Sequence, residues 1–187
     1  MIDEIRSFIE KNLKESRITH TYNVMKEAER LCEIYGEDVE LARIAALAHD
    51  MAKYIPREEM NRYVREYGMP EHYIDNPNLA HSKIAGIMME KDFGITDRRI
   101  IDAVCYHTTG RAGMSTLEKI LFIADAIEPG RKYPGVESIR RLAATNLDAA
   151  CLESLNHTLE FLEGKGVYID PDTLAARDFF RNKEERN

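Results

Sequence analysis

The sequence has no hydrophobic run long enough to cross a membrane, because no segment approaches the about 18 consecutive apolar residues that a spanning helix needs. It also starts without the basic and then apolar layout of a signal peptide. Its three cysteines form no CxxC pair and lie within helical patterns, which is typical of reduced structural thiols. These absences predict a cytoplasmic protein without a membrane segment.

Positive charge is also scarce. The chain has 26 Lys and Arg against 33 Asp and Glu, which gives a formal net charge of -7. A broad nucleic-acid-binding face usually appears as net positive charge, so we expect no nucleic-acid partner. A small anionic substrate remains compatible with this balance, since a few local cations around a metal ion can hold it.

The alternating pattern of strands is missing as well, whereas helical periodicity runs through nearly the whole sequence. With 187 residues, of which 44% are hydrophobic, the chain is long enough to bury one substantial core. No repeat and no linker divides it. The sequence therefore predicts an all-α protein, a helical bundle that forms one domain over residues 1–187.

Capping residues, glycines and prolines suggest where the helices begin and end. Residues 69–79, which include Pro70 and Pro77, are expected to form an irregular connection. The expected helices are 2–14, a second one capped by Ser16 and ended by Gly36, a third one capped by Asp38 that ends near His49, then 57–67, about 80–92, 97–107, 115–127, 136–145, 147–163 and a polar C-terminal helix.

Six metal-capable side chains fall on core-facing positions of these helices or at their ends: His20, His49, Asp50, His81, His107 and Asp125. Asp125 lies inside the apolar segment 121–127, where an unpaired carboxylate would be strongly destabilising. A metal ion would remove this conflict. Imidazole and carboxylate ligands without thiolate suit iron, manganese or zinc, and such an ion generates hydroxide near neutral pH.

Any one of these histidines, taken alone, is more often a hydrogen-bonded core or helix-end residue than a metal ligand. The set of core-facing positions, with an aspartate inside an apolar helix, favours the metal site instead. His72 lies in the irregular connection and His157 in a helix of mixed character. We interpret both as surface or packing residues.

Three cations lie next to the ends of the segments that carry these ligands. Arg17 precedes His20 by about one turn, Lys53 follows the His49-Asp50 pair, and Arg131 follows the Pro129-Gly130 stop after Asp125. Arginine suits bidentate contact with phosphate, and lysine acts as a point charge. The sequence thus predicts phosphate binding beside the metal. Thr108 could also donate to a phosphate, although a helix-end cap explains it equally well.

With these motifs in view, the chain resembles the HD-domain superfamily, and within it the YqeK-type symmetrical bis(5'-nucleosyl)-tetraphosphatases, which hydrolyse diadenosine tetraphosphate. The resemblance covers nearly the whole chain. The His49-Asp50 pair alone is typical of the superfamily, whereas the segments HTTG and ADAIEPGR are specific to the narrower family. The matching segments are residues 17–21 (RITHT), 48–53 (AHDMAK), 79–82 (LAHS), 106–110 (YHTTG), 117–131 (LEKILFIADAIEPGR) and 168–173 (YIDPDT).

This resemblance implies hydrolysis of diadenosine tetraphosphate to two ADP. Iron is favoured as cofactor, as Fe2+ or as a di-iron pair, and manganese or another divalent metal remains an alternative. Position by position, the resemblance implies that His20, His49, Asp50 and Asp125 hold the principal metal. It assigns His81 and His107 to a second metal or to phosphate. It further assigns phosphate binding to Arg17, Lys53, Thr108 and Arg131, and the nucleoside site to the tail with Tyr168, Asp170 and Thr173.

Two other functions compete with this reading. An HD enzyme that removes phosphate from mononucleotides needs the same ligands, so only the identity of the products separates the two. A non-catalytic nucleotide receptor would be expected to lose at least one ligand, and this sequence keeps all six. The sequence leaves a homodimer open.

Overall fold

The helical periodicity of the sequence corresponds to ten α-helices and one short 3-10 helix in the computed structural model, which describes residues 1–186. No strand occurs within these residues, so the all-α prediction is confirmed. The elements are α1 (Ile2–Asn12), α2 (Glu15–Tyr35), α3 (Val39–Ala48), α4 (Arg57–Glu66), η1 (Glu71–Tyr73), α5 (Pro77–Asp92), α6 (Arg98–Tyr106), α7 (Thr116–Ile127), α8 (Val136–Ala143), α9 (Leu147–Lys165) and α10 (Pro171–Glu184).

Most helix ends lie where local capping chemistry places them. Asp38 accepts hydrogen bonds from the first backbone amides of α3, and Asp97 does the same for α6. Ser115 and Glu118 form a reciprocal capping box at the start of α7. Gly36 ends α2 with φ 69°, a conformation that glycine adopts without the steric cost of a side chain.

Two predicted boundaries are wrong. Ser16 does not cap α2, because that helix already begins at Glu15 and follows α1 after only two residues, so Ser16 lies in its first turn. The helix expected from about residue 80 begins at Pro77. Proline fits the first position of a helix, where the missing N–H has no partner to lose. The connection before it also contains the 3-10 turn η1.

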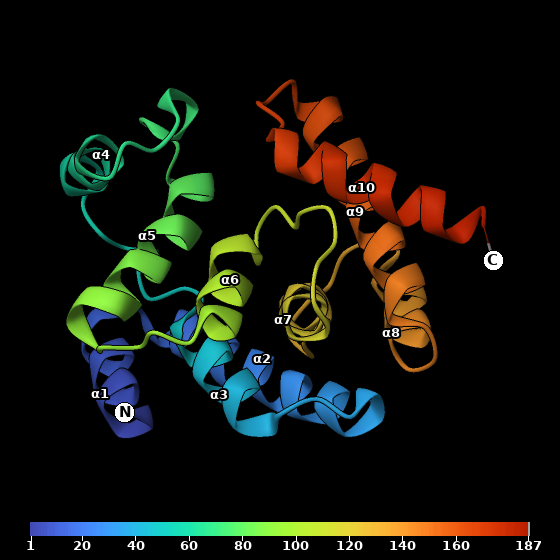
Figure 1. Cartoon of the computed structure of the whole chain (residues 1–187), viewed down its shortest axis with the longest axis horizontal. Helices are drawn as coiled ribbons and strands as arrows, with labels where there is room; N and C mark the ends of the chain where they lie inside the picture. The colour runs from blue at the N-terminus through green and yellow to red at the C-terminus, as the bar shows by residue number, and fades with distance from the viewer. Residues whose placement is uncertain (187) are drawn as a thin grey trace.

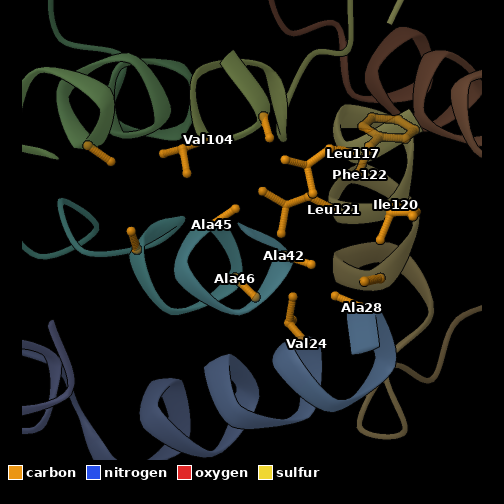
Figure 2. Close-up of a cluster of buried hydrophobic side chains, with 14 of the residues drawn as sticks. Val24, Ala28, Ala42, Ala45, Ala46, Val104, Leu117, Ile120, Leu121 and Phe122 are labelled. Atoms are coloured by element: carbon orange, nitrogen blue, oxygen red, sulfur yellow. The ribbon is translucent and has the colours of Figure 1, made fainter. Parts of the chain in front are cut away.

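The core forms where α2, α3, α6 and α7 meet, as Figure 2 shows with Val24 and Ala28 from α2 facing alanines of α3 and large side chains of α7. Small side chains on α3 allow its neighbours to approach closely, while leucine, isoleucine and phenylalanine from α7 fill the remaining space. The labelled members of this cluster are Val24, Ala28, Ala42, Ala45, Ala46, Val104, Leu117, Ile120, Leu121 and Phe122.

Helix α7 contacts both the early helices α2, α3 and α6 and the C-terminal helices α8 and α9. In Figure 1 it is seen nearly end-on, with α2, α3 and α6 on one side and α8, α9 and α10 on the other. Both α8 and α9 pack against it, and α10 packs on α9. Side chains of α7 can therefore face the early helices and the C-terminal helices at the same time. No helix among the described residues is long and apolar enough to cross a membrane.

Helices α5 and α6 approach each other closely at Gly86. A Cβ atom at this position would lie 2.3 Å from Cys105 Sγ, so a larger residue would fit there only if the Cys105 side chain moved. Burial raises the pKa of the Cys105 thiol to about 11 and that of Cys32 to about 11 as well. Both thiols therefore stay protonated near neutral pH, which agrees with the structural role expected for the cysteines.

Candidate metal centre

The predicted ligands come together because five helices of the bundle pass or end near one point. His49 is the C-cap residue directly after α3 and Asp50 follows it, while His107 is the C-cap residue directly after α6. The other three lie within α2, α5 and α7. The side chain of Asp125 is 21% exposed. The remaining five residues are at most 8% exposed, and they are His20, His49, Asp50, His81 and His107.

The ligand atoms of these six residues lie within a few ångströms of one another. Asp50 Oδ1 is 3.2 Å from His81 Nε2, and Asp50 Oδ2 is 3.3 Å from His49 Nε2. His20 Nε2 is 3.1 Å from Asp125 Oδ1. Three overlapping trios have all their donor atoms within 4.8 Å, a spacing that a metal ion can bridge. We call the six residues the His/Asp cluster.

The hydrogen bonds of the four imidazoles fix which nitrogen faces the centre. Nδ1 of His49, His81 and His107 lies 2.6, 3.0 and 2.7 Å from the carbonyl oxygens of Ala46, Pro77 and Val104. A carbonyl only accepts, so each Nδ1 must carry the proton. In a neutral ring, Nε2 then carries a lone pair and no proton. All four Nε2 atoms lie in the cluster, since that of His20 faces Asp125.

This arrangement fits a metal ion. The Nε2 atoms of His20 and His49 are buried and make no hydrogen bond to any described residue, although carboxylate oxygens lie 3.1 and 3.3 Å away. Lone pairs that face carboxylates repel one another, and a cation between them turns this repulsion into coordination. Metal-bound histidines usually donate their other ring N–H to a carbonyl or a carboxylate, as these do.

The pKa shifts of Asp50, Asp125 and His107 agree with that chemistry, whereas the pKa of His49 is raised, because burial lowers it less than the attraction of the neighbouring Asp50 raises it. Burial raises the pKa of Asp50, but the neighbouring His49 and His81 lower it more, so it lies well below its usual value. Burial also raises the pKa of Asp125, and the contacts with His20 and Arg131 outweigh this effect. Burial, together with the nearby His49 and His81, lowers the pKa of His107 to about 3. Ionised carboxylates beside a neutral imidazole are what a metal ion requires.

The three predicted cations surround the His/Asp cluster. Arg17 Nη1 donates to Asp50 Oδ2 at 2.9 Å, and Lys53 Nζ lies 3.9 Å from Asp50 Oδ1. Arg131 donates through Nε to the carbonyl oxygen of Asp125 at 2.7 Å and through Nη2 to its carboxylate. Thr108 Oγ1 lies 3.2 Å from His107 Nε2. All four side chains therefore lie beside the His/Asp cluster.

The cluster opens into a cavity of about 830 Å³, a size typical of small-molecule sites. On one side the cavity is lined by cluster residues together with Arg17, Lys53, Thr108 and Arg131. On the opposite side it is lined by side chains of α9 and of the loop before α8. His157 belongs to this second group, a position that its interpretation as a surface or packing residue missed.

The HD domain family matches residues 17–130, the part of the chain that carries the whole His/Asp cluster. The chain belongs to the HD domain family.

Two relatives are similar over nearly their whole length. A symmetrical bis(5'-nucleosyl)-tetraphosphatase of Bacillus subtilis (strain 168) is 41% identical over 93% of this chain and 94% of the relative. One of Staphylococcus aureus (strain NCTC 8325), with the same description, is 33% identical over 99% and 97%. A solved structure from Clostridium acetobutylicum, described as a predicted HD superfamily hydrolase involved in NAD metabolism, matches with TM-score 0.93 and 39% identity over 98% of both chains.

Glu128, in the segment ADAIEPGR, is a buried carboxylate beside the cluster that was not among the predicted site residues. Glu128 is 3% exposed and has its Oε1 3.1 Å from Nδ1 of His20. Asn23 and the backbone amide of Gly130 donate to its other oxygen at 3.1 and 2.6 Å. A Cβ atom at Gly130 would lie 2.8 Å from Glu128 Oε1, so a side chain there would displace this carboxylate. Glu128 thereby orients His20 with Nε2 toward the cluster.

We expect Glu128→Ala to weaken metal binding by about 10- to 100-fold, because His20 would lose the partner that fixes its ring and its tautomer. Glu128→Gln keeps an oxygen acceptor and should lose less. Competition with a chelator, followed by metal analysis, measures the affinity. Glu137→Ala on α8 removes an exposed glutamate and serves as control. Unchanged metal affinity in Glu128→Ala would show that His20 is oriented without this carboxylate.

The structure does not bring the tail residues to the cavity. Asp170 caps α10 by accepting from the amide of Asp172, and it also accepts from the Tyr73 hydroxyl at 3.0 Å. Tyr168 stacks on His72, with ring centroids 4.9 Å apart, and Thr173 is buried. Among the described residues that line the cavity, none comes from positions 168–173. These contacts connect the start of α10 to η1 and not to the cavity. A role of the tail in nucleoside binding therefore stays a prediction.

Proposed function

We propose that this protein hydrolyses diadenosine tetraphosphate symmetrically into two ADP. The observation that carries the proposal is the His/Asp cluster with three cations beside it, at the end of a cavity large enough for a nucleotide. Relatives from Bacillus subtilis and Staphylococcus aureus that bear this activity in their descriptions support the choice of substrate. We also propose that residues 1–187 act as one domain, since α8 and α9 pack on α7 and side chains of α9 line the cavity.

We propose iron as the metal, either as Fe2+ or as a di-iron pair, with manganese or another divalent ion as the alternative. His20, His49, Asp50 and Asp125 would hold the principal ion, and His81 with His107 would hold a second ion or contact phosphate. The nitrogen and oxygen donor set without sulfur suits these metals. Bound there, the metal lowers the pKa of its water from about 15.7 toward about 7 and supplies a nucleophile near neutral pH.

The chain's own residues then orient the phosphates. Arg17, Lys53 and Arg131 carry positive charge around the cluster, and they would offset the negative charge of the transferred group. Burial lowers the pKa of Lys53, Asp50 counteracts this, and Arg17 lowers it further. In the reaction the water oxygen bonds to the second phosphorus. The bond from that phosphorus to the oxygen leading to the third phosphorus breaks, and ADP leaves with this oxygen.

We propose the cytoplasm as the compartment, because three free thiols are typical of a reducing environment.

The position of the cut tests the proposed function. In oxygen-18 water, diadenosine tetraphosphate should yield ADP alone, with one labelled oxygen on one of each two ADP molecules. Mass spectrometry of the products measures both. AMP together with ATP would refute the symmetrical cut. Release of inorganic phosphate from mononucleotides, without cleavage of any dinucleotide, would identify the protein as a different HD phosphohydrolase.

A further inference from the structure

Helix α9 presents one face to the cavity. His157, Thr158 and Phe161 lie three, four and seven residues after Ser154, and all four line the cavity. Side chains with these spacings lie on the same side of a helix. The opposite side of α9, with Leu155 and Leu159, is buried in the protein. We call the four residues, together with Tyr133, the α9 wall.

The α9 wall is held in place before any ligand binds. The Tyr133 hydroxyl donates to the carbonyl oxygen of Ala126 at 2.9 Å, and the Tyr133 ring lies edge-on to His157, with centroids 5.5 Å apart. A Cβ atom at Gly135, where φ is 92°, would lie 2.5 Å from His157 Nε2. The loop after Arg131 therefore lies directly against α9. A preorganised wall binds with a smaller entropy cost.

The two ends of the cavity differ in charge. Arg17, Lys53 and Arg131 lie at the cluster end. The α9 wall itself contains no lysine or arginine, and Glu160, which lines the cavity beside it, is acidic. One cation approaches the wall, since Lys165 Nζ lies 5.8 Å from the centroid of the Phe161 ring. Phosphates are therefore attracted more strongly to the three cations of the cluster end than to the wall. The wall offers aromatic rings, two hydroxyls and an imidazole instead.

Phe161 is the exposed aromatic side chain of this wall. It is 61% exposed, although it lines the cavity. A flat aromatic surface at the mouth of a nucleotide-sized cavity is suited to stack on a base. The hydroxyls of Ser154 and Thr158 can each donate or accept a hydrogen bond, so they can serve a ribose or either purine edge.

We propose that the α9 wall binds the nucleoside of one ADP half of the substrate, with the purine base against Phe161 and Tyr133. The ribose and the base edge then face Ser154, His157 and Thr158, and the phosphates extend past Arg131 to the His/Asp cluster. This site rests on the proposed function and replaces the tail as the base-binding surface. Because hydroxyls serve adenine and guanine equally, the wall accepts both purines.

The test compares ligands with and without a base on the metal-loaded protein. Phe161→Ala should raise KM for diadenosine tetraphosphate and the Kd of ADP by about tenfold, the effect expected from loss of one stacked base. The Kd of inorganic tripolyphosphate, which has no base, should remain within about twofold of wild type. Phe161→Tyr keeps the ring and should restore ADP binding. Isothermal titration calorimetry provides each Kd.

Phe179→Ala is the matched control, because Phe179 is an exposed phenylalanine on α10 that does not belong to the described lining of the cavity. Equal weakening of ADP and tripolyphosphate in Phe161→Ala would overturn the proposal, as would unchanged ADP binding. A rise in KM for Tyr168→Ala without one for Phe161→Ala would indicate that the tail, and not the α9 wall, binds the base. Failure of wild type to cleave the dinucleotide would refute the proposed function. The ADP titrations would still show whether the α9 wall binds the base.

Discussion

Asp50→Ala is expected to reduce hydrolysis of diadenosine tetraphosphate on the order of 10³-fold or more, with the helical fold retained. Asp50 is 3% exposed and lies at the centre of the His/Asp cluster. Its two oxygens lie within 3.3 Å of His81 and His49 and accept from Arg17. The proposed principal metal would lose a carboxylate ligand that no neighbouring residue replaces, and the nucleophile would no longer form near neutral pH.

Steady-state turnover, metal content and circular dichroism on the same preparation measure this effect. Metal should raise the Tm of wild type more than that of Asp50→Ala, because a ligand that binds only the native state stabilises it. Asp178→Ala on α10 removes an exposed carboxylate paired only with its neighbour Arg177 and serves as control. Near-normal activity of a well-folded Asp50→Ala protein would contradict the metal assignment.

The second large effect is expected at the cations. Arg131→Ala and Lys53→Ala should each lower kcat/KM by about 100-fold, because each removes a positive group from the place where charge develops in the transition state. Both side chains are only partly exposed and line the cavity. Their charges are therefore less screened by solvent than those of surface residues. Metal content should stay near that of wild type.

The measurement pairs kinetics with metal analysis of each variant. Arg131→Lys keeps the positive charge but loses the planar guanidinium group that can contact a phosphate through two N–H donors. It should therefore recover only part of the activity. Arg141→Ala changes an exposed arginine on α8 and provides the control. Since Arg131 also donates to Asp125, a parallel fall of metal content and activity would mean that it holds this carboxylate in place and does not bind phosphate.

The fold was predictable where local chemistry decides the backbone. Asp38, Asp97 and Gly36 act on amides and dihedral angles within a few residues, so their effects can be read from the sequence. Ser16 and Pro77 were misjudged because each residue is compatible with more than one position near a helix start. Which position it takes depends on how the neighbouring helices pack.

The His/Asp cluster was predictable for a different reason. A histidine or an aspartate on an apolar helix face needs a partner in the core, and six such residues in one chain indicate a common site. A role of Glu128 in the site was not predicted, because a glutamate before Pro129-Gly130 is typical of an exposed helix end. Its burial depends on contact with His20, 108 residues away, which no local pattern encodes.

The sequence by itself determined the all-α fold, the histidines and aspartates that meet at the cluster and the cations beside them. Each of these follows from helical periodicity combined with the high free-energy cost of burying a polar group without a partner. Only the tertiary structure decided that the cavity extends to α9 rather than to the tail. That choice depends on how α8, α9 and α10 pack around α7, where the same exposed side chains could have faced either solvent or the cavity.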